Sequence, residues 1–290
     1  MTGIAIFKDG RASTAELEKS LKNTLDPVQT RLISVDSDSL HAGRLEAGDI
    51  NLFILPGTPG TNDYHKLINP AGNQRILKAH DNGVAGLYLC AGAYYASRAF
   101  AYHFATENYM KHGTRSLNLF NGYALGPQRC LKTSFDKAIG DGFKSVAHVR
   151  YQDLDDVWTA GQAHYSGGPV LLHGDYDRSG NPPGSITWEP LAMYEYKDNR
   201  APQPTAIAGY MDKTPLILSG VVPEYGVRPD EQTYQYGALQ DFATALQSAE
   251  PERTRLWVRY LRHLLPENAL RPPFRQEKTR DITLDHILSA

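Results

Sequence analysis

Cys90 is the residue whose neighbours most clearly suggest chemistry. It follows the apolar run GLYL (86–89) and precedes the small residues Ala91, Gly92 and Ala93. A strand that turns abruptly into a helix needs small residues around the bend, as in the nucleophile elbows of hydrolases. In that geometry the thiol projects into a cleft, and the helix N-terminus favours its thiolate form. We therefore predict a reactive thiol at Cys90; the alternative is a small buried cysteine that simply fits a tight corner.

A reactive cysteine of this kind also needs hydrogen-bond donors for the oxyanion that forms on a carbonyl. The run INLFILPG (50–57) reads as a strand that ends in Pro-Gly, which allows close approach of the backbone. We expect the donors to be the backbone amides of Gly57 or Thr58 and of Ala91.

The elements that must position Cys90 alternate between strand and helix in the first hundred residues. Nearly continuous apolar strands are expected at 3–7, 30–35, 50–57 and 84–89. Amphipathic helices are expected at 13–25 and 73–80, and a further helix at 91–104, directly after Cys90. Apolar strands separated by helices indicate a parallel sheet covered on both faces. The predicted class is a flavodoxin-like, doubly wound α/β fold, and ligands of such sheets gather beyond the carboxyl ends of the strands.

Past residue 115 the pattern changes to short strands separated by Gly and Pro turns. We expect these strands to form hairpins that extend the same sheet, followed by a closing helix at 251–265. Residues 266–290 read as a polar C-terminal tail. The prediction is one domain over 1–265 and a tail over 266–290.

Composition excludes several function classes. The 290 residues include 30 basic and 32 acidic side chains, for a formal charge of −2, with no block of like charges. Nucleic acid and membrane are therefore not expected as partners. The N-terminus lacks the features of a signal peptide, so we expect a cytoplasmic protein with reduced thiols. Two cysteines and scattered histidines offer no metal-site spacing, and we expect no metal and no cofactor.

Two enzyme classes fail on their motifs. No Gly-x-Gly-x-x-Gly follows the first strand, which argues against a dinucleotide-binding fold. The chain also lacks the Gly-x-Ser-x-Gly of α/β-hydrolases.

An ordered series of motifs resembles one known family. They are FKDGRAS (7–13), LFILPG (52–57), CAGAYY (90–95), LFNGYALGP (119–127), HYSGGPV (164–170), AIAGY (206–210) and LSGVVPEY (218–225). Together they resemble the N-terminal domain of eukaryotic biotin-protein ligases and its free-standing bacterial relatives. That family is placed in the class I glutamine amidotransferase-like superfamily. The resemblance covers most of the chain to about residue 265, and the chain contains no biotin-ligase catalytic domain.

The resemblance implies a cysteine that attacks a carbonyl, a histidine that serves as its base, and a glutamate that orients the histidine. The last two normally read His-Pro-Glu, whereas this chain has Val222-Pro223-Glu224. Glu224 keeps the position of the orienting carboxylate, but valine cannot accept a proton. Standard glutaminase chemistry is therefore not expected.

A partner for the thiol could come from elsewhere in the chain. In a related branch of the superfamily an acidic residue after the first strand contacts the cysteine, and Asp9 matches that position, although Asp-Gly is also a common turn pair. His164 and His173 flank SGGPVLL and are alternative bases, each also readable as a packing or surface histidine. His103 is not expected to contribute, because a continuous helix would carry it about 20 Å from Cys90.

Two accounts of function remain open. In the first, the protein is a hydrolase or transferase that acts on an amide or thioester carbonyl through Cys90, with Glu224 and Asp9 as further catalytic residues. In the second, it is a catalytically inactive domain that binds a ligand or a protein, with Tyr64, Tyr94, Tyr95 and Tyr225 lining an aromatic pocket. The expected partner is a small-molecule or peptide-like substrate, and a homodimer is left open.

Overall fold

The computed structural model describes most of the 290 residues. They are residues 1–9, 12, 14–58, 64–103, 110–128, 130–139, 142–153, 155–173, 186–226 and 238–275. Within them, no helix is long and apolar enough to cross a membrane.

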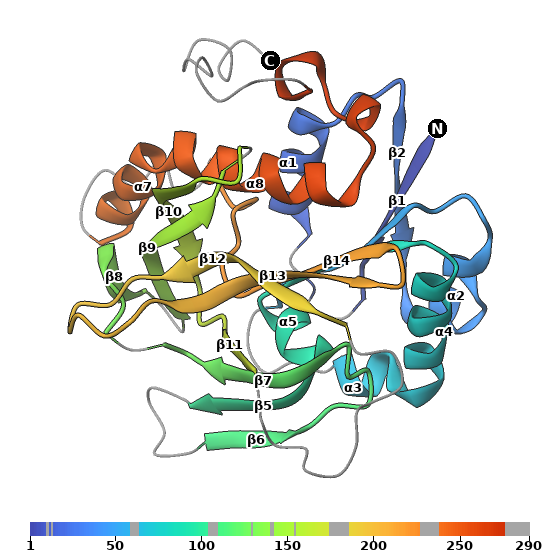
Figure 1. Ribbon diagram of the computed structural model, residues 1–290, viewed down its shortest axis with the longest axis horizontal. Coiled ribbons are helices and arrows are strands. Elements are labelled where there is room, and N and C mark those ends of the chain that lie inside the picture. Colours follow the sequence, from blue (N-terminus) through green and yellow to red (C-terminus); the bar gives the residue numbers. More distant parts are fainter. Residues whose placement is uncertain are drawn as a thin grey trace.

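A parallel sheet forms the centre of the molecule (Figure 1). Its strands are β1 (Thr2–Phe7), β2 (Thr30–Val35), β3 (Leu52–Leu55), β4 (Ala85–Leu89) and β14 (Thr214–Ser219). Neighbouring strands pair in parallel in the order β2-β1-β3-β4-β14. This is the strand order of the flavodoxin-like doubly wound sheet. The fold class predicted from the apolar strands is confirmed.

Antiparallel strands extend this sheet beyond β14. They are β8 (Thr133–Ile139), β9 (Gly142–Gln152), β10 (Trp158–Tyr165), β12 (Trp188–Tyr194) and β13 (Gln203–Met211). The resulting sheet has ten strands, with the order β10-β9-β12-β13-β14 on the added side and β8 paired to β9. The hairpins expected after residue 115 do extend the central sheet.

A second sheet of four strands was not expected from the sequence. It comprises β5 (Ser97–His103), β6 (Met110–Thr114), β7 (Phe120–Gly126) and β11 (Val170–His173), in the order β11-β7-β5-β6. The prediction of one helix over 91–104 is therefore wrong. The helix α5 ends at Ala96, and the chain continues as β5 because both edges of that segment find strand partners, β6 and β7. Pairing with distant strands overrides local helix propensity here.

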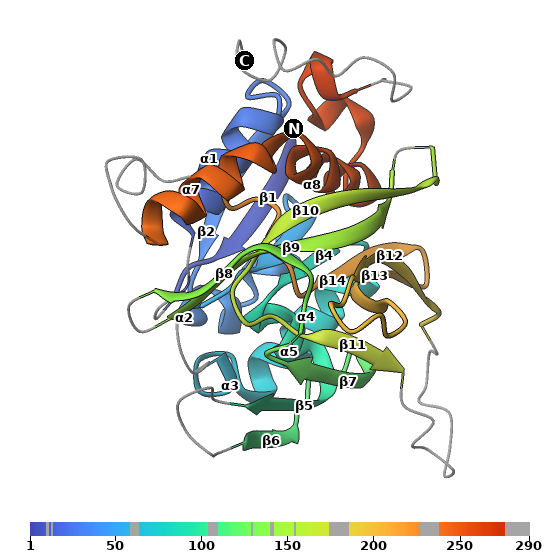
Figure 2. The same ribbon diagram turned by 90° about the vertical axis from the view of Figure 1, so that its left-hand side faces the viewer.

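The two faces of the central sheet bury separate hydrophobic clusters. Side chains alternate along β1, so that Ile4 and Ile6 belong to one cluster while Ala5 and Phe7 belong to the other. The first face is covered by α1 (Ala15–Thr24) and α8 (Glu250–Leu264), with α7 (Ala238–Ser248) beside them over β8 and β9. The opposite face is covered by α2 (Ser37–His41), the 3-10 helix η1 (Arg44–Glu46), α3 (Tyr64–Leu67), α4 (Asn69–Asp81) and α5 (Ala91–Ala96). Figure 2 shows the helices on both sides of the sheet and the small sheet beyond α5.

The segment after α8 packs against the start of the chain. It contains the 3-10 helices η2 (Glu267–Ala269) and η3 (Pro272–Phe274), and Leu270 forms a β-bridge with Leu25. The Asp26 amide donates to the Ala269 carbonyl over 2.9 Å. The first ten residues of the predicted tail are therefore part of the packed fold, and residues 276–290 lie outside the described residues.

Candidate active site

Cys90 stands in the one-residue turn between β4 and α5. Its backbone has φ 48° and ψ −103°, a region that non-glycine residues rarely adopt. Two hydrogen bonds hold this conformation: the Cys90 amide donates to the Ser219 carbonyl over 2.7 Å, and the Tyr94 amide donates to the Cys90 carbonyl over 3.2 Å. Strained residues of this kind cluster at functional sites. The structure therefore has the strand-to-helix corner that the sequence predicts.

Glycines allow the backbone to close around this corner. A Cβ added at Gly92 would lie 2.2 Å from the Leu55 carbonyl oxygen, so only glycine lets α5 pack on the end of β3. A Cβ added at Gly57 would lie 3.4 Å from the Cβ of Cys90, which places this backbone directly beside the elbow. The Thr58 hydroxyl, next along the chain, is buried with no hydrogen-bond partner among the described residues.

The thiol of Cys90 is protonated in this environment. Cys90 is half-buried, and its S–H points to the Ser166 carbonyl oxygen, 3.8 Å from the sulfur. Burial among protein atoms raises the pKa of the thiol to about 12; a hydrogen bond from the Ala91 amide lowers it, and the negative charge of Glu224 raises it. The expectation of a stabilised thiolate is therefore wrong. The helix dipole that was expected to favour it belongs to a six-residue helix, and desolvation outweighs it.

Tyrosine side chains surround the sulfur. Five of them are close enough to Cys90 to interact electrostatically with it: Tyr64, Tyr94, Tyr102, Tyr165 and Tyr194. The Tyr94 hydroxyl donates to the Gly167 carbonyl over 3.0 Å, and the Tyr64 hydroxyl donates to the Pro56 carbonyl over 2.8 Å. Burial is the main reason that the pKa of each of the five phenols is raised, so they act as neutral hydrogen-bonding groups.

Two other predicted pocket tyrosines have different roles. Tyr95 donates to the Asn73 side chain over 2.8 Å within the core under α4. Tyr225 stacks on His164, with ring centroids 4.2 Å apart. Of the four tyrosines predicted to line the pocket, Tyr64 and Tyr94 interact with Cys90. The other tyrosines that interact with Cys90 were not predicted.

Glu224 lies in the turn after β14 and is 7% exposed. Its carboxyl interacts electrostatically with Cys90 and with Arg253 of α8. Burial raises the pKa of Glu224 to about 8, while its own backbone amide and the Arg253 guanidinium lower it. At neutral pH the carboxyl is therefore mostly protonated.

Val222 stands where the family's base is expected, and His164, one of the predicted alternative bases, contacts its backbone. The Val222 side chain is 8% exposed and belongs to the same hydrophobic cluster against which Cys90 packs. Its amide donates to the His164 carbonyl over 3.1 Å, but the His164 ring lies between Tyr225 and Phe242, at 4.2 and 5.4 Å between centroids. Since neighbours on a strand face opposite sides, Tyr165 is turned to the cysteine and His164 to the helix α7 side.

The other candidates from the sequence lie on β11, at the end of β5 and after β1. His173 is exposed on β11, where its ring packs on Phe120 at 5.2 Å. His103 is the last residue of β5 and does not lie on a long helix. The distance of about 20 Å from Cys90 that was expected from the rise of a helix therefore does not apply. The Asp9 carboxylate accepts hydrogen bonds from the amide and the hydroxyl of Ser37 at the start of α2. These contacts give Asp9 a structural role in joining β1 to α2.

A comparison with protein-family models decides the family. The model described as "Biotin-protein ligase, N terminal" matches residues 7–289. The chain belongs to this family. The resemblance stated from the motifs is confirmed, and it extends beyond residue 265 to nearly the end of the chain.

Solved structures similar to this family member have low sequence identity to it. A glutamine amidotransferase from Methylobacillus flagellatus has a TM-score of 0.47 at 11% identity, over 97% of this chain and 98% of that chain. PurLQS from Thermotoga maritima has a TM-score of 0.46 at 10% identity, over 87% and 98% of the two chains. A putative ThuA-like protein from Bacteroides uniformis has a TM-score of 0.40 at 11% identity, over 87% and 90%. The search of curated proteins found no match.

Sequence reasoning missed several groups at this family member's site. Tyr165 and the Ser166 carbonyl lie inside the motif HYSGGPV. From this motif His164 was predicted as a possible base, whereas the two residues that follow it were not predicted. Tyr102 and Tyr194 come from strands whose pairing only the structure shows, and nothing in the sequence marks them. Arg253, which faces Glu224 from α8, likewise carried no signal.

The described residues include no group of three or more His, Cys, Asp or Glu side chains that could hold a metal ion.

Proposed function

We propose that this protein is a cysteine-dependent transferase or hydrolase in which Cys90 attacks a carbonyl carbon, with thioesters favoured over amides as substrates. The observation that carries the proposal is the strained conformation of Cys90, with the Ala91 amide beside its sulfur. Such strain costs about 1–3 kcal/mol, and a residue that merely fills space does not need it.

The missing histidine argues for a thioester. An amide releases an amine, which must gain a proton as the C–N bond breaks, and a histidine usually supplies that proton. A thioester releases a thiolate, which is a stable leaving group near neutral pH. In the balanced step the Cys90 sulfur forms a C–S bond, the thioester C–S bond breaks, and the thiol proton passes to the departing sulfur. Val222 is no obstacle to that exchange.

The surroundings of Cys90 supply recognition. In this proposal the amides of Gly57 or Thr58 and of Ala91 bind the oxyanion, since the backbone at Gly57 lies beside the cysteine and Ala91 follows it. Tyr64 and Tyr94 are neutral phenols that can bind the polar part of a small-molecule or peptide-like substrate. Glu224 remains a protonated carboxyl that limits negative charge near the sulfur.

Direct acylation tests this function. The Cys130→Ser protein is incubated with a small acetyl thioester at pH 8.5, and intact-mass and peptide mass spectrometry locate the acetyl group. The expected result is one acetyl group on Cys90 and none in the Cys90→Ser, Cys130→Ser double variant. Absence of the adduct, or equal labelling of lysines and Cys90, would contradict the proposal.

Restoring the missing base is a second test. Val222→His restores an imidazole two residues before Glu224, in the cluster against which Cys90 packs, and we expect hydrolysis of an activated amide to rise at least tenfold. Val222→Leu is the matched control, because it changes the same buried side chain without adding a proton acceptor. If both variants leave amide hydrolysis at the wild-type level, the surrounding site does not have the arrangement proposed here.

A second candidate function is ligand binding without turnover. The specific observation in its favour is that the thiol proton points to the Ser166 carbonyl, in a site without an imidazole beside the sulfur among the described residues. In that case a thioester should bind and protect Cys90 from alkylation without acylating it. Protection without an adduct supports this account, and an adduct rejects it.

A further inference from the structure

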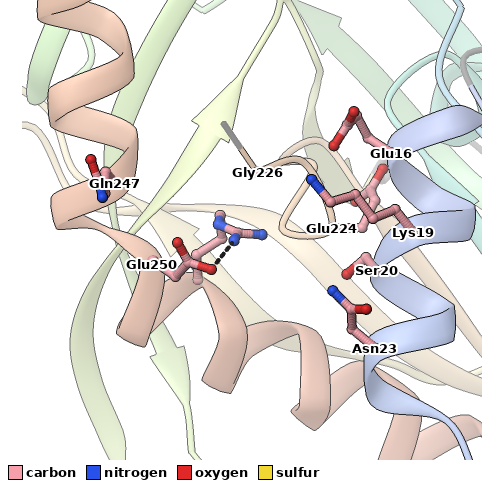
Figure 3. Close-up of a pocket in the computed structure, with 9 residues that line it drawn as sticks. Glu16, Lys19, Ser20, Asn23, Glu224, Gly226, Gln247 and Glu250 are labelled. Carbon is pink, nitrogen blue, oxygen red and sulfur yellow. Dashed lines mark ion pairs between the residues drawn. The ribbon is translucent and has the colours of Figure 1, made fainter. Parts of the chain in front are cut away.

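The side of Glu224 that borders α1 opens into a second pocket (Figure 3). The pocket has a volume of about 180 Å³, which corresponds to roughly six water molecules. Its charged lining consists of Glu16 and Lys19 of α1, Glu224, and Glu250 and Arg253 of α8. Ser20, Asn23, Gly226 and Gln247 complete the lining, which is polar on every side. Cys90 is not among these residues.

Glu224 leaves a polar atom unsatisfied in this pocket. The side chain is 7% exposed, and its Oε2 is buried without a hydrogen-bond partner among the described residues. An unsatisfied buried carboxyl oxygen costs about 1–3 kcal/mol or more, so such an atom normally has a partner. Figure 3 shows Glu224 on the same side of the pocket as Glu16 and Lys19. A donor in the pocket would satisfy Oε2 once the carboxyl turns toward it, because Oε2 itself is closed to solvent in this structure.

Arg253 presents a second unsatisfied group from the opposite wall. Its guanidinium donates to the Pro223 carbonyl over 2.6 Å and pairs with Glu250 at 3.4 Å. Its Nε is buried without a hydrogen-bond partner among the described residues. Lys19, on the α1 wall, is exposed and makes no ion pair within the described parts of the chain. The pocket therefore offers positive charge at Arg253 and Lys19 as well as the acceptor on Glu224.

We propose that this pocket is a binding site for a small zwitterion of the α-amino acid type, with its ammonium group on Glu224 and its carboxylate between Lys19 and Arg253. The volume admits a molecule the size of glycine or alanine, and the lining carries both charges that such a molecule needs. A simple amine would leave Lys19 and the Arg253 Nε without an acceptor, and a simple carboxylate would leave Glu224 without a donor.

Ligand binding at this pocket is linked to the protonation of Glu224. An ammonium group favours the ionised carboxylate, so binding at pH 7 releases a proton and tightens as the pH rises through about 8. The charged and titratable groups that act on Glu224 or line its pocket are Glu16, Lys19, Glu250, Arg253, Cys90 and Tyr260. Of the lining cations, Arg253 already lowers the pKa of Glu224 without ionising it fully at neutral pH.

The same linkage reaches Cys90. The negative charge of Glu224 raises the pKa of the Cys90 thiol. A ligand that ionises Glu224 therefore lowers the thiolate fraction, although its own positive charge compensates part of this effect. Binding at the pocket should slow alkylation of Cys90 at least about twofold, without contact between the ligand and the sulfur.

Titration of the full-length protein with glycine tests the site. Calorimetry and NMR are used at pH 6.5 and 8.5, with ethylammonium and acetate as the two half-molecules. We expect one glycine per chain, affinity about tenfold higher at pH 8.5, and at least tenfold weaker binding of either half-molecule. No binding of glycine at 100 mM overturns the proposal. Equal binding of ethylammonium or of acetate overturns the zwitterion assignment.

Variants locate the binding in the pocket. Lys19→Gln should weaken glycine at least fivefold, whereas Lys22→Gln, one turn further on α1 and outside the pocket, should leave it unchanged. Glu224→Gln should weaken glycine at least tenfold and remove the pH dependence. Because Lys19 is exposed, its replacement is expected to fold normally. Binding that is indifferent to Lys19→Gln and Glu224→Gln lies elsewhere and rejects the site.

Discussion

Two ionisable side chains, Cys90 and Glu224, are central to the proposed function, and burial raises the pKa of both. Their position could be predicted from sequence: small residues after Cys90 indicate the corner, and the motif ending in Glu224 identifies the carboxylate. Their protonation could not, because it depends on burial by residues far away in the chain. The Ala91 amide at the start of α5 lowers the pKa of Cys90, which is the direction predicted, but desolvation is larger and determines the sign of the pKa shift.

Glu224 predicts a distinctive dependence of stability on pH. The carboxyl has a pKa near 4.5 when unfolded and about 8 when folded, so the folded state binds more protons between these values. The free energy of unfolding contributed by Glu224 is fully present below pH 4.5 and is lost as the pH rises through 8. Glu224→Gln removes this loss, which amounts to at most about 5 kcal/mol. In urea unfolding at pH 5, 7 and 9, the free energy of unfolding of the variant should increase relative to that of the wild type as the pH rises. Parallel profiles for the two proteins would contradict the shifted pKa.

At the scale of elements, the elbow depends on how closely α5 approaches the end of β3. The strands around it could be predicted, because apolar runs bounded by turn residues are typical of buried parallel strands. The six-residue length of α5 could not be predicted, since Ser97–His103 becomes a strand only when β6 and β7 pair with it. Gly92 makes the close approach feasible, and its role is visible only once Leu55 is seen against it.

Gly92→Ala should therefore disturb both stability and the cysteine. The new Cβ would lie 2.2 Å from the Leu55 carbonyl oxygen, a backbone atom that cannot move alone. We expect a loss of about 2–3 kcal/mol in the free energy of unfolding and a changed alkylation rate at Cys90. Gly48→Ala is the control, because φ is +78° there but the space is open, and it should cost about 1 kcal/mol of backbone strain. Equal losses of unfolding free energy in the two variants would show that the close approach of Gly92 to Leu55 does not determine stability.

At the scale of the whole molecule, the chain closes on itself through the segment after α8. Residues 266–275 were expected to be a polar tail, and their proline and charge content gave no sign of docking. The reason they dock is long-range: Leu270 pairs with Leu25, and Arg271 binds two carbonyl groups at the end of α1. The central sheet was predictable from local patterns, whereas this closure and the four-stranded sheet join segments far apart in sequence.

Arg271 gives this closure a measurable contribution. Its Nε donates to the Leu25 carbonyl over 3.1 Å and a terminal nitrogen donates to the Lys22 carbonyl over 2.9 Å. These carbonyls lie at the C-terminal end of α1, where a cation is favourable. Arg271→Ala should lower the free energy of unfolding by about 1–2 kcal/mol and Tm by about 2–6 °C. Arg200→Ala, which removes an exposed ion pair with Asp198 and a cation–π contact with Tyr196, should change Tm by less than half as much. A shift no larger than that of the control would show that Arg271 does not hold the closure.

The pH profile of Cys90 alkylation tests the central claim most directly. The claim is that Cys90 is a solvent-accessible but protonated thiol at a strained elbow. The Cys130→Ser protein is reacted with iodoacetamide from pH 6 to pH 10.5, and modified Cys90 is counted by mass spectrometry. The account predicts modification of Cys90 at a rate that rises about tenfold per pH unit across the range without a plateau, because burial raises the pKa of the thiol to about 12. A rate that levels off below pH 8 would contradict it by revealing a thiolate, and no modification at any pH would contradict the accessibility of the sulfur.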